Sequence, residues 1–286
     1  MNTIYLNGKF LPKSQATVSV LDRGFLFGDG VYEVIPVYDG KPLGLTEHLE
    51  RFERSCKGIR ITPPLSFPEW KKILKELTAQ NNLQGKSFSF YLQITRGSDT
   101  ERAHAFPEKV SPTVLAWCKG LDKKPQAEID CGLKAITCED KRRNDCYVKA
   151  INLLSNVLCY QLAKEAHAAE AILIRNGNAI EATSSNLFIV KNNILITAPL
   201  CNQILPGITR QLVIQLAKKN NLSVEERFIK KEELFSADEV WLTASNKEIY
   251  PIVQIDDCLI QNGKVGTLWK KMIAWYQELK KTGEPL

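Results

Sequence analysis

The feature that most constrains the fold is a set of tight-turn dipeptides, each flanked by short apolar runs. Asn7-Gly8 separates two strand-like runs near the start, and Asp39-Gly40 does the same in "VYEVIPVYDGKPL". Asn176-Gly177 and Asn192-Asn193 interrupt a strand-like stretch in the second half. Such dipeptides accept the positive φ that short hairpin loops require. The sequence therefore predicts antiparallel hairpins in both halves of the chain.

Two helices are predicted in the first half, after the second hairpin. In "TEHLERFERSCKGI", Leu49, Phe52 and Cys56 share one face with Ile59, and Thr46 is placed to cap the start. The stretch "FPEWKKILKELTAQNN" repeats this spacing, and "SFSFYLQITRG" and "SPTVLAWC" have the pattern of strands. Strands and helices in separate runs predict an α+β domain with an antiparallel sheet.

The periodic pattern lapses at residues 118–128, and we place a domain boundary there. The predicted domains are an N-terminal α+β domain, residues 1–120, and a C-terminal domain, residues 121–286. In the second domain we expect a helix from about Lys149 to His167, with an inward stripe of Leu153, Val157, Tyr160 and Ala163. Helices over "TRQLVIQLAKKNN" and "VGTLWKKMIAWYQELKK" and strands over "DEVWLTAS" and "YPIVQID" complete it.

Composition excludes several classes of function. The 286 residues carry a net charge of only +6, and no basic block is interleaved with aromatic residues, so a nucleic-acid partner is not expected. No apolar run approaches the ~20 residues of a membrane span, and the start does not resemble a signal peptide. The eight cysteines form no CxxC pair, which favours reduced thiols, a cytoplasmic location and no metal site. Cys56 and Cys159 fit helix faces and should pack as small apolar residues.

Lys149 stands at the entry to the apolar stretch "INLLSNVLCY". Burial penalises a charged amine, so a single lysine in such a place is most simply an exposed residue at a helix end. A buried lysine is tolerated when its neutral amine attacks a carbonyl and forms a Schiff base. The other motifs of the chain have to decide between these two interpretations.

Three further segments could carry chemistry. In "LPGITRQLV", Pro206 and Gly207 bend the chain, and Ile208 and Thr209 then offer N–H groups at a helix N-terminus, which suits a phosphate or is an ordinary turn. The loop "TASNKE", residues 243–248, is either a second anion-binding loop or a simple turn. Glu181, in "IEATSSNLFIV", leads into a buried strand and needs a partner, for example a protonated ring nitrogen.

The stretch "RAHAFP" places Arg102 and His104 two residues apart. In an extended segment these side chains point the same way, so the pair could hold a substrate carboxylate, or it could be part of a solvated loop.

Together these motifs resemble one family, the class IV, fold type IV, pyridoxal-phosphate-dependent aminotransferases. The resemblance runs in order through "FGDGVYEVIPVY", "HLERFERS", "RAHAFP", "VKAINLLSNVL", "IEATSSNLFIV", "LPGITR" and "VWLTASNKEIYPI". Because of the "RxH" pair, the sequence is most similar to the D-amino-acid (D-alanine) aminotransferases within that family. The resemblance implies a two-domain α+β fold, with a smaller N-terminal α/β sandwich domain and a larger C-terminal, barrel-like α/β domain that binds the cofactor.

The resemblance also implies a role for each motif in binding pyridoxal 5'-phosphate. Lys149 would form the Schiff base and move the substrate proton, and Glu181 would accept the hydrogen bond of the pyridine N–H. Leu205 would pack on the cofactor ring. Phosphate contacts would come from Arg51, Ile208, Thr209 and Ser245. Ala244 stands where the D-amino-acid enzymes commonly have a hydroxyl residue, so one phosphate contact would be missing here.

For the substrate, Tyr32, Arg102 and His104 match the group that traps its carboxylate. In the family Arg102 and His104 reach the site from the neighbouring subunit, which implies a homodimer. The implied reaction is transamination between a D-amino acid such as D-alanine and a 2-oxo acid such as 2-oxoglutarate. An aminodeoxychorismate lyase and a branched-chain aminotransferase share the lysine, the glutamate and the phosphate loop and stay open as alternatives. A non-catalytic ligand-binding or scaffold protein that kept the fold is the alternative from another class.

Overall fold

In the computed structural model, which describes residues 1–121, 124–283 and 286, the chain forms two compact units. The first unit comprises residues 1–121, 148–152 and the end of the chain from residue 280, and the second comprises the remaining described residues. The chain therefore passes from the first unit to the second and back more than once, and the segment that contains Lys149 belongs to the first unit. The predicted division into domains 1–120 and 121–286 stays a prediction.

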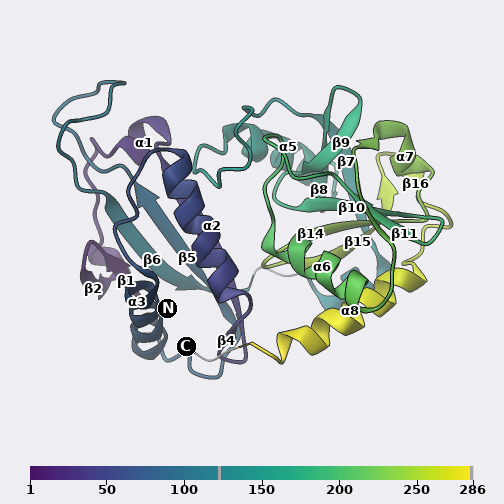
Figure 1. Ribbon diagram of the computed structural model, residues 1–286, viewed down its shortest axis with the longest axis horizontal. Helices are drawn as coiled ribbons and strands as arrows, with labels where there is room; N and C mark the ends of the chain where they lie inside the picture. Colours follow the sequence, from purple (N-terminus) through teal and green to yellow (C-terminus); the bar gives the residue numbers. More distant parts are fainter. Residues whose placement is uncertain (122–123, 284–285) are drawn as a thin grey trace. The chain divides into compact units, whose positions relative to one another are not determined.

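The first unit is built on an antiparallel sheet whose described strands have the order β2-β1-β6-β5-β3-β4. Helices α2 and α3 cover one face of this sheet (Figure 1). The strands are β1 (Thr3–Leu6), β2 (Lys9–Pro12), β3 (Gly30–Tyr38), β4 (Lys41–Pro42), β5 (Phe88–Thr95) and β6 (Thr113–Lys119). The helices are the 3₁₀ turn η1 (Lys13–Gln15), α1 (Arg23–Phe27), α2 (Leu45–Gly58) and α3 (Phe67–Gln80).

The core of the first unit lies between this sheet and the two helices. Alternate residues of β3, such as Ile35 and Val37, point into it, and Phe52 and Cys56 of α2 meet them there. Both predicted helices are confirmed, but Thr46 does not cap α2. The helix begins at Leu45 after Gly44, whose φ of 68° suits glycine, so Thr46 already lies inside the first turn.

The second unit contains a mixed sheet, in which the described strands have the order β12-β11-β10-β14-β15-β7-β8-β9-β13, with β16 paired to β15. The sheet curls, because β9 lies near β10 although four strands separate them in this order. Its strands are β7 (Leu133–Glu139), β8 (Glu170–Arg175), β9 (Asn178–Ala182), β10 (Asn186–Lys191), β11 (Ile194–Thr197), β12 (Val224–Glu226), β13 (Ile229–Lys230), β14 (Glu239–Ala244), β15 (Glu248–Ile255) and β16 (Cys258–Leu259). Its helices are α4 (Gln126–Cys131), α5 (Leu154–Glu165), α6 (Ile208–Lys219), α7 (Lys231–Phe235) and α8 (Thr267–Lys280).

The four predicted turns are confirmed. Asn7, Asp39, Asn176 and Asn192 each have φ near 50° and are followed by a second residue with positive φ. The first two turns join β1 to β2 and β3 to β4, and the other two join β8 to β9 and β10 to β11. This agreement is expected because a two-residue turn is encoded almost entirely by its own residues.

The predicted helix from Lys149 is wrong at its start, because α5 begins only at Leu154. Residues before it pair with the start of β3 instead: Ala150 forms a bridge with Val31, and the Lys149 carbonyl accepts a hydrogen bond from the Tyr32 N–H at 2.9 Å. Long-range strand pairing thus overrides the local apolar pattern.

The predicted inward stripe of this helix is also wrong in part. Val157 and Tyr160 are exposed, whereas Ala163 is buried as predicted, and Leu153 precedes the helix. Helix α5 packs through Cys159 and Ala163 against Ala171 and Leu173 of β8. Cys56 and Cys159 are both buried, as predicted.

Two negative findings bear on function. In the described part of the chain, no helix is both long and apolar enough to cross a bilayer. Nor do the described residues include a group of three or more His, Cys, Asp or Glu side chains arranged to hold a metal ion.

Removing the Phe52 side chain should weaken the first unit strongly. Phe52 is 2% exposed and packs against the Trp70 ring at a centroid distance of 5.7 Å. Phe52→Ala should lower the free energy of unfolding by about 3–5 kcal/mol in urea titrations. Phe67→Ala, at a position 40% exposed at the start of α3, is the matched control and should cost about 1 kcal/mol or less. Equal losses in the two variants would contradict this account of the core.

Candidate active site

In the first unit, Lys149 lies beside Tyr32. The Lys149 Nζ is 4.2 Å from the centroid of the Tyr32 ring, and its backbone N–H donates to Ser55 Oγ at 3.2 Å. The backbone hydrogen bond from the Tyr32 N–H to the Lys149 carbonyl holds the two residues side by side. Lys149 is half-buried rather than fully exposed, so the simple interpretation of an exposed helix end does not hold.

A buried group of three charged or polar side chains lies between β3 and α2. The Glu33 carboxylate accepts hydrogen bonds from Arg51 Nε at 3.0 Å and Arg51 Nη2 at 2.6 Å. The His48 Nδ1 lies 2.9 Å from the same carboxylate. Burial lowers the pKa of His48, so at neutral pH the ring is uncharged and donates through one tautomer.

This group places Arg51 in a different setting from the one expected from the sequence. Arg51 lies on α2, is buried and faces Glu33. The sequence interpretation missed Glu33 and His48. The available signal was Glu33 itself, an acidic residue in the otherwise apolar strand "VYEVIPVY", which needs a partner on the covering helix.

Arg102 and His104 lie on a loop outside the sheet. Both side chains approach the same ring, that of Phe27 at the end of α1. The Arg102 guanidinium carbon is 4.9 Å from the ring centroid, and the His104 ring is 5.5 Å away. Both residues are exposed.

In the second unit, Glu181 of β9 is 4% exposed and has several partners. One carboxylate oxygen accepts hydrogen bonds from Asn186 Nδ2 at 2.9 Å and from the Leu205 N–H at 3.2 Å. The other oxygen contacts Arg142, which also binds Asp140. Burial raises the pKa of Glu181 above its ordinary value, although Arg142 acts in the opposite direction.

Arg142 and Asn186 are functional candidates that the sequence interpretation missed. Arg142 stood in the polar cluster "KRRND" and Asn186 in the turn "TSSN". Neither stretch shows by itself that its side chain turns inward toward Glu181, because the contact depends on the curl of the sheet.

The N-terminus of α6 lies close to Glu181. Asn186 Nδ2 also donates to the Leu205 carbonyl at 2.9 Å, and a Cβ on Gly207 would lie 1.9 Å from Asn186 Oδ1, so no side chain fits at residue 207. Ile208 and Thr209 follow as the first two helical residues, both buried, and their N–H groups have no partner within the helix. N–H groups at a helix N-terminus are donors of the kind that bind anions, and the phosphate loop stays a prediction.

Ser245 lies in the turn that joins β14 to β15. Thr243, two residues before Ser245, is the β14 residue paired with Asn186 of β10. Helix α6 also packs against β14. Within the second unit, Glu181, Leu205, Ile208, Thr209 and Ser245 thus come from one neighbourhood.

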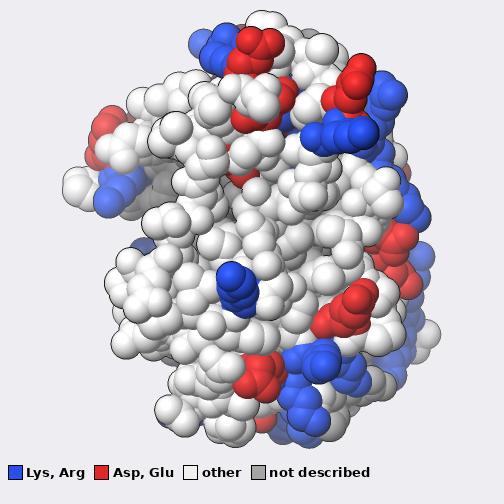
Figure 2. Space-filling model, turned by 90° about the vertical axis from the view of Figure 1, so that its left-hand side faces the viewer, with Lys and Arg blue, Asp and Glu red and all other residues white. Residues whose placement is uncertain are grey.

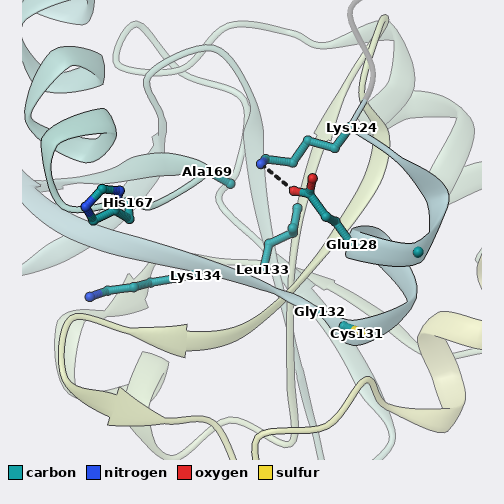
Figure 3. A pocket seen from close by; sticks show the side chains of 9 residues that line it. Lys124, Glu128, Cys131, Gly132, Leu133, Lys134, His167 and Ala169 are labelled. Carbon is teal, nitrogen blue, oxygen red and sulfur yellow. Dashed lines mark hydrogen bonds and ion pairs between the residues drawn. The ribbon is translucent and has the colours of Figure 1, made fainter.

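A surface pocket elsewhere in the second unit includes none of these residues (Figure 3). Lys124 and Glu128, on its wall, neutralise each other in an ion pair of 2.8 Å. Its lining consists of Lys124, Ala127, Glu128, Cys131, Gly132, Leu133, Lys134, His167 and Ala169.

Because of Glu33, the free energy of unfolding should fall as the pH is lowered into the acid range. Its ion pair with Arg51 and contact with His48 overcome the effect of burial and hold the pKa of Glu33 far below the ordinary value of 4.5. A carboxyl group whose pKa is lower in the folded state than in the unfolded state stabilises the fold fully at any pH above its unfolded-state pKa. This stabilisation is lost as the pH falls from the unfolded-state pKa toward the folded-state pKa. Glu33→Gln should cost about 3–5 kcal/mol at pH 7, because it leaves Arg51 buried without its carboxylate.

Below pH 4.5 the difference between the parent and Glu33→Gln should narrow by about 1.4 kcal/mol per pH unit, measured by urea unfolding across pH. Glu53→Gln, on the exposed side of the same helix, is the control and should follow the parent at every pH. A difference that stays constant down to low pH would contradict the ionised state of Glu33.

Comparison with known proteins finds relatives over nearly the whole chain. Residues 30–255 match the family model for amino-transferase class IV. A D-alanine aminotransferase of Bacillus licheniformis is 42% identical over 94% of this chain and 94% of its own length. One from Staphylococcus epidermidis is 38% identical over 97% of this chain and 98% of its own.

Solved structures give the same answer for the fold. The branched-chain amino acid aminotransferase of Escherichia coli superposes with a TM-score of 0.90 at 26% identity, over 99% of this chain and 96% of that one. A putative 4-amino-4-deoxychorismate lyase of Legionella pneumophila gives 0.84 at 25% identity, over 93% of this chain and 97% of that one. These likenesses confirm the predicted α+β, fold type IV architecture. This chain belongs to the class IV aminotransferase family.

Proposed function

We propose that this protein transfers the amino group of a D-amino acid, such as D-alanine, to a 2-oxo acid such as 2-oxoglutarate, with pyridoxal 5'-phosphate as its cofactor. The main support is the "RxH" pair, Arg102 and His104, whose side chains both approach the Phe27 ring. The 42% identity to a D-alanine aminotransferase points the same way. We also propose a cytoplasmic location, which suits the eight free cysteines.

The residues of the second unit suit this cofactor. Glu181 is a buried carboxylate whose charged form is disfavoured by burial, so an N–H donor on the cofactor ring would stabilise it. The unpaired N–H groups of Ile208 and Thr209 suit a phosphate, as does the Ser245 hydroxyl. Leu205, fixed by its bonds to Glu181 and Asn186, would pack against the ring. The hydroxyl that Ala244 lacks would leave one phosphate contact fewer.

Lys149 would attach the cofactor and then move a proton at the substrate Cα. When bound, the cofactor ring supplies an electron sink for the pair released from that carbon. Tyr32 lies against the lysine and would limit the directions that its amine can take. Arg51 would add a contact to the phosphate, with Glu33 fixing the plane of its guanidinium.

Substrate orientation would follow from fixing two of its groups. Arg102 can bind a carboxylate in bidentate fashion, and His104 and Tyr32 can add hydrogen bonds. With the carboxylate and the amino group both held, only one enantiomer presents its Cα proton to Lys149. That enantiomer would be D.

We further propose a homodimer in which Arg102 and His104 act in the neighbouring subunit's site. Large apolar side chains are exposed on both units: Val20 and Phe25 are 73% and 75% exposed, and Leu154 on α5 is 72% exposed. Figure 2 shows a face of the molecule whose centre has few charged residues, with more of them at its margins. Few charges and exposed apolar residues are typical of the core of a subunit interface.

The alternatives make different products. The likeness to a branched-chain aminotransferase, with a TM-score of 0.90, keeps an L-amino-acid enzyme open, and the likeness to a putative lyase keeps an elimination open. A lyase would release pyruvate and need no amino acceptor. A scaffold protein would not bind the cofactor covalently.

Stereochemistry is the sharpest test of the proposed reaction. D-alanine should discharge the visible absorbance of the cofactor-loaded protein, L-alanine should not, and D-alanine with 2-oxoglutarate should give D-glutamate. Lys149→Ala should lower turnover by about 10³-fold or more, because both its covalent and its proton-transfer roles are lost. A response to L-alanine alone would overturn the proposed substrate class. Full turnover by Lys149→Ala would overturn the proposed chemistry.

Mixing two impaired subunits tests the dimer, with the rate measured at a D-alanine concentration far below KM, where the Arg102→Leu chain alone should be nearly inactive. In a hybrid of Lys149→Ala and Arg102→Leu chains, one of the two sites would combine an intact Lys149 with an intact Arg102 from its neighbour. Refolding the two chains together should therefore restore about a quarter of the parent activity, since about half of the dimers are hybrids and each has one intact site. Lys149→Ala mixed with Glu181→Ala is the control and should restore none, because both residues would serve the same subunit's site. No recovery in the first mixture would contradict the shared site.

A further inference from the structure

The loop that carries Arg102 and His104 is held by one buried side chain, Arg23. Arg23 Nη1 donates to the carbonyls of Ala103 at 2.6 Å and Ala105 at 3.1 Å, and Nη2 donates to the His104 carbonyl at 3.1 Å. Three successive peptide carbonyls therefore converge on one guanidinium. Because these carbonyls are fixed, the backbone directions from which the neighbouring side chains leave the loop are fixed too.

Arg23 is itself fixed in two ways. Its Nε donates to Asp29 Oδ2 at 2.9 Å, and its side chain is only 4% exposed. Its own helix, α1, is anchored by Asp22, which accepts hydrogen bonds from the Gly24 N–H and from the hydroxyls of Thr95 and Thr113. The loop is thus tied to the rigid sheet through α1.

A second arginine fixes the far end of the same loop. Arg96 binds both oxygens of Asp29, at 2.7 and 3.0 Å, and its guanidinium carbon lies 3.6 Å from the centre of the Phe106 ring. Asp29 therefore joins two arginines, one under residues 103–105 and one under Phe106. The Phe27 ring completes the support, since it contacts Arg23 as well as Arg102 and His104.

We propose that Arg23 is a positioning residue for substrate recognition: it shapes the 102–106 loop so that Arg102 and His104 present their side chains together to a substrate carboxylate. This inference rests on the proposed function, in which those two residues bind that carboxylate. Arg23 itself touches no substrate, because its donors are directed to the loop carbonyls and to Asp29.

The geometry requires the fork of an arginine rather than a positive charge alone. A guanidinium offers five N–H donors in one plane, whereas a lysine offers three donors from a single nitrogen. Lysine at residue 23 would keep the charge beside Asp29 but could not reach three carbonyls and that carboxylate at once. Arg23→Lys therefore separates loop shape from charge.

The effect should appear in the KM of every substrate that carries the carboxylate. In the cofactor-loaded enzyme, Arg23→Lys should raise the KM of both D-alanine and 2-oxoglutarate by about tenfold and change kcat by about threefold or less. Phe27→Ala, which removes a half-exposed ring from the same support, should shift KM in the same direction. If Arg23→Lys folds poorly, the KM of Phe27→Ala still tests the proposal. Arg54→Lys, at an exposed position of α2, is the matched control and should leave both constants unchanged.

A double variant decides whether Arg23 acts through Arg102. If it does, Arg23→Lys should add no more than about twofold to the KM of an Arg102→Leu enzyme, because the side chain that it positions is already gone. Independent, multiplicative effects would overturn the positioning role, as would a loss of kcat at unchanged KM. If Arg102→Leu alone leaves KM unchanged, the proposed carboxylate trap fails, and this inference fails with it. If Arg102→Leu raises KM but Arg23→Lys leaves KM unchanged, the positioning role of Arg23 is overturned, while the proposed carboxylate trap stands.

Discussion

One buried carboxylate, that of Glu181, joins the segments of the second unit that are proposed to hold the cofactor. A carboxylate removed from water is costly unless it is hydrogen-bonded or paired. Glu181 meets this need by taking Asn186, the Leu205 backbone and Arg142 as partners, and these lie on three different segments of the chain. The same contacts bring the segment before α6 against β10, where Gly207 leaves room for the close approach. The carboxylate and the helix N-terminus, which are the two features that suit the cofactor, therefore depend on one set of hydrogen bonds.

A second buried carboxylate has a comparable part in the first unit. Glu33 binds Arg51 and His48 of α2. The preceding residue of the strand, Tyr32, points to the opposite face and contacts Lys149. Because side chains alternate along a strand, the Glu33 ion pair and the Lys149 amine lie on opposite faces of β3. Further along the same unit, Asp29 joins Arg23 to Arg96 and supports the loop of Arg102 and His104. Arg102 and His104 are thus exposed groups whose loop rests on buried charge pairs.

Local signals predicted much of the fold, and long-range contacts account for what they missed. The turn at Asn7-Gly8 and the helix over α2 are encoded by neighbouring residues, so both could be found from the sequence. The start of α5 could not, because the segment around Lys149 pairs with β3, more than a hundred residues earlier. For the same reason the motifs identified Arg51, Glu181 and Arg102 as candidates, but they did not identify Glu33 and Arg142, which pair with the first two, or Arg23, which binds the loop of the third. A charged residue in an apolar stretch shows that a partner is needed, and only the fold shows which residue it is.

The central claim is that the amine of Lys149 carries the cofactor. The most direct measurement is to load the protein with pyridoxal 5'-phosphate, reduce it with borohydride so that an amine–aldehyde link becomes permanent, and map the added mass by peptide mass spectrometry. The account predicts one modified peptide, the one containing Lys149, and protection of that site when D-alanine is added before reduction. Stoichiometric modification of a different lysine, with Lys149 unmodified, would contradict it.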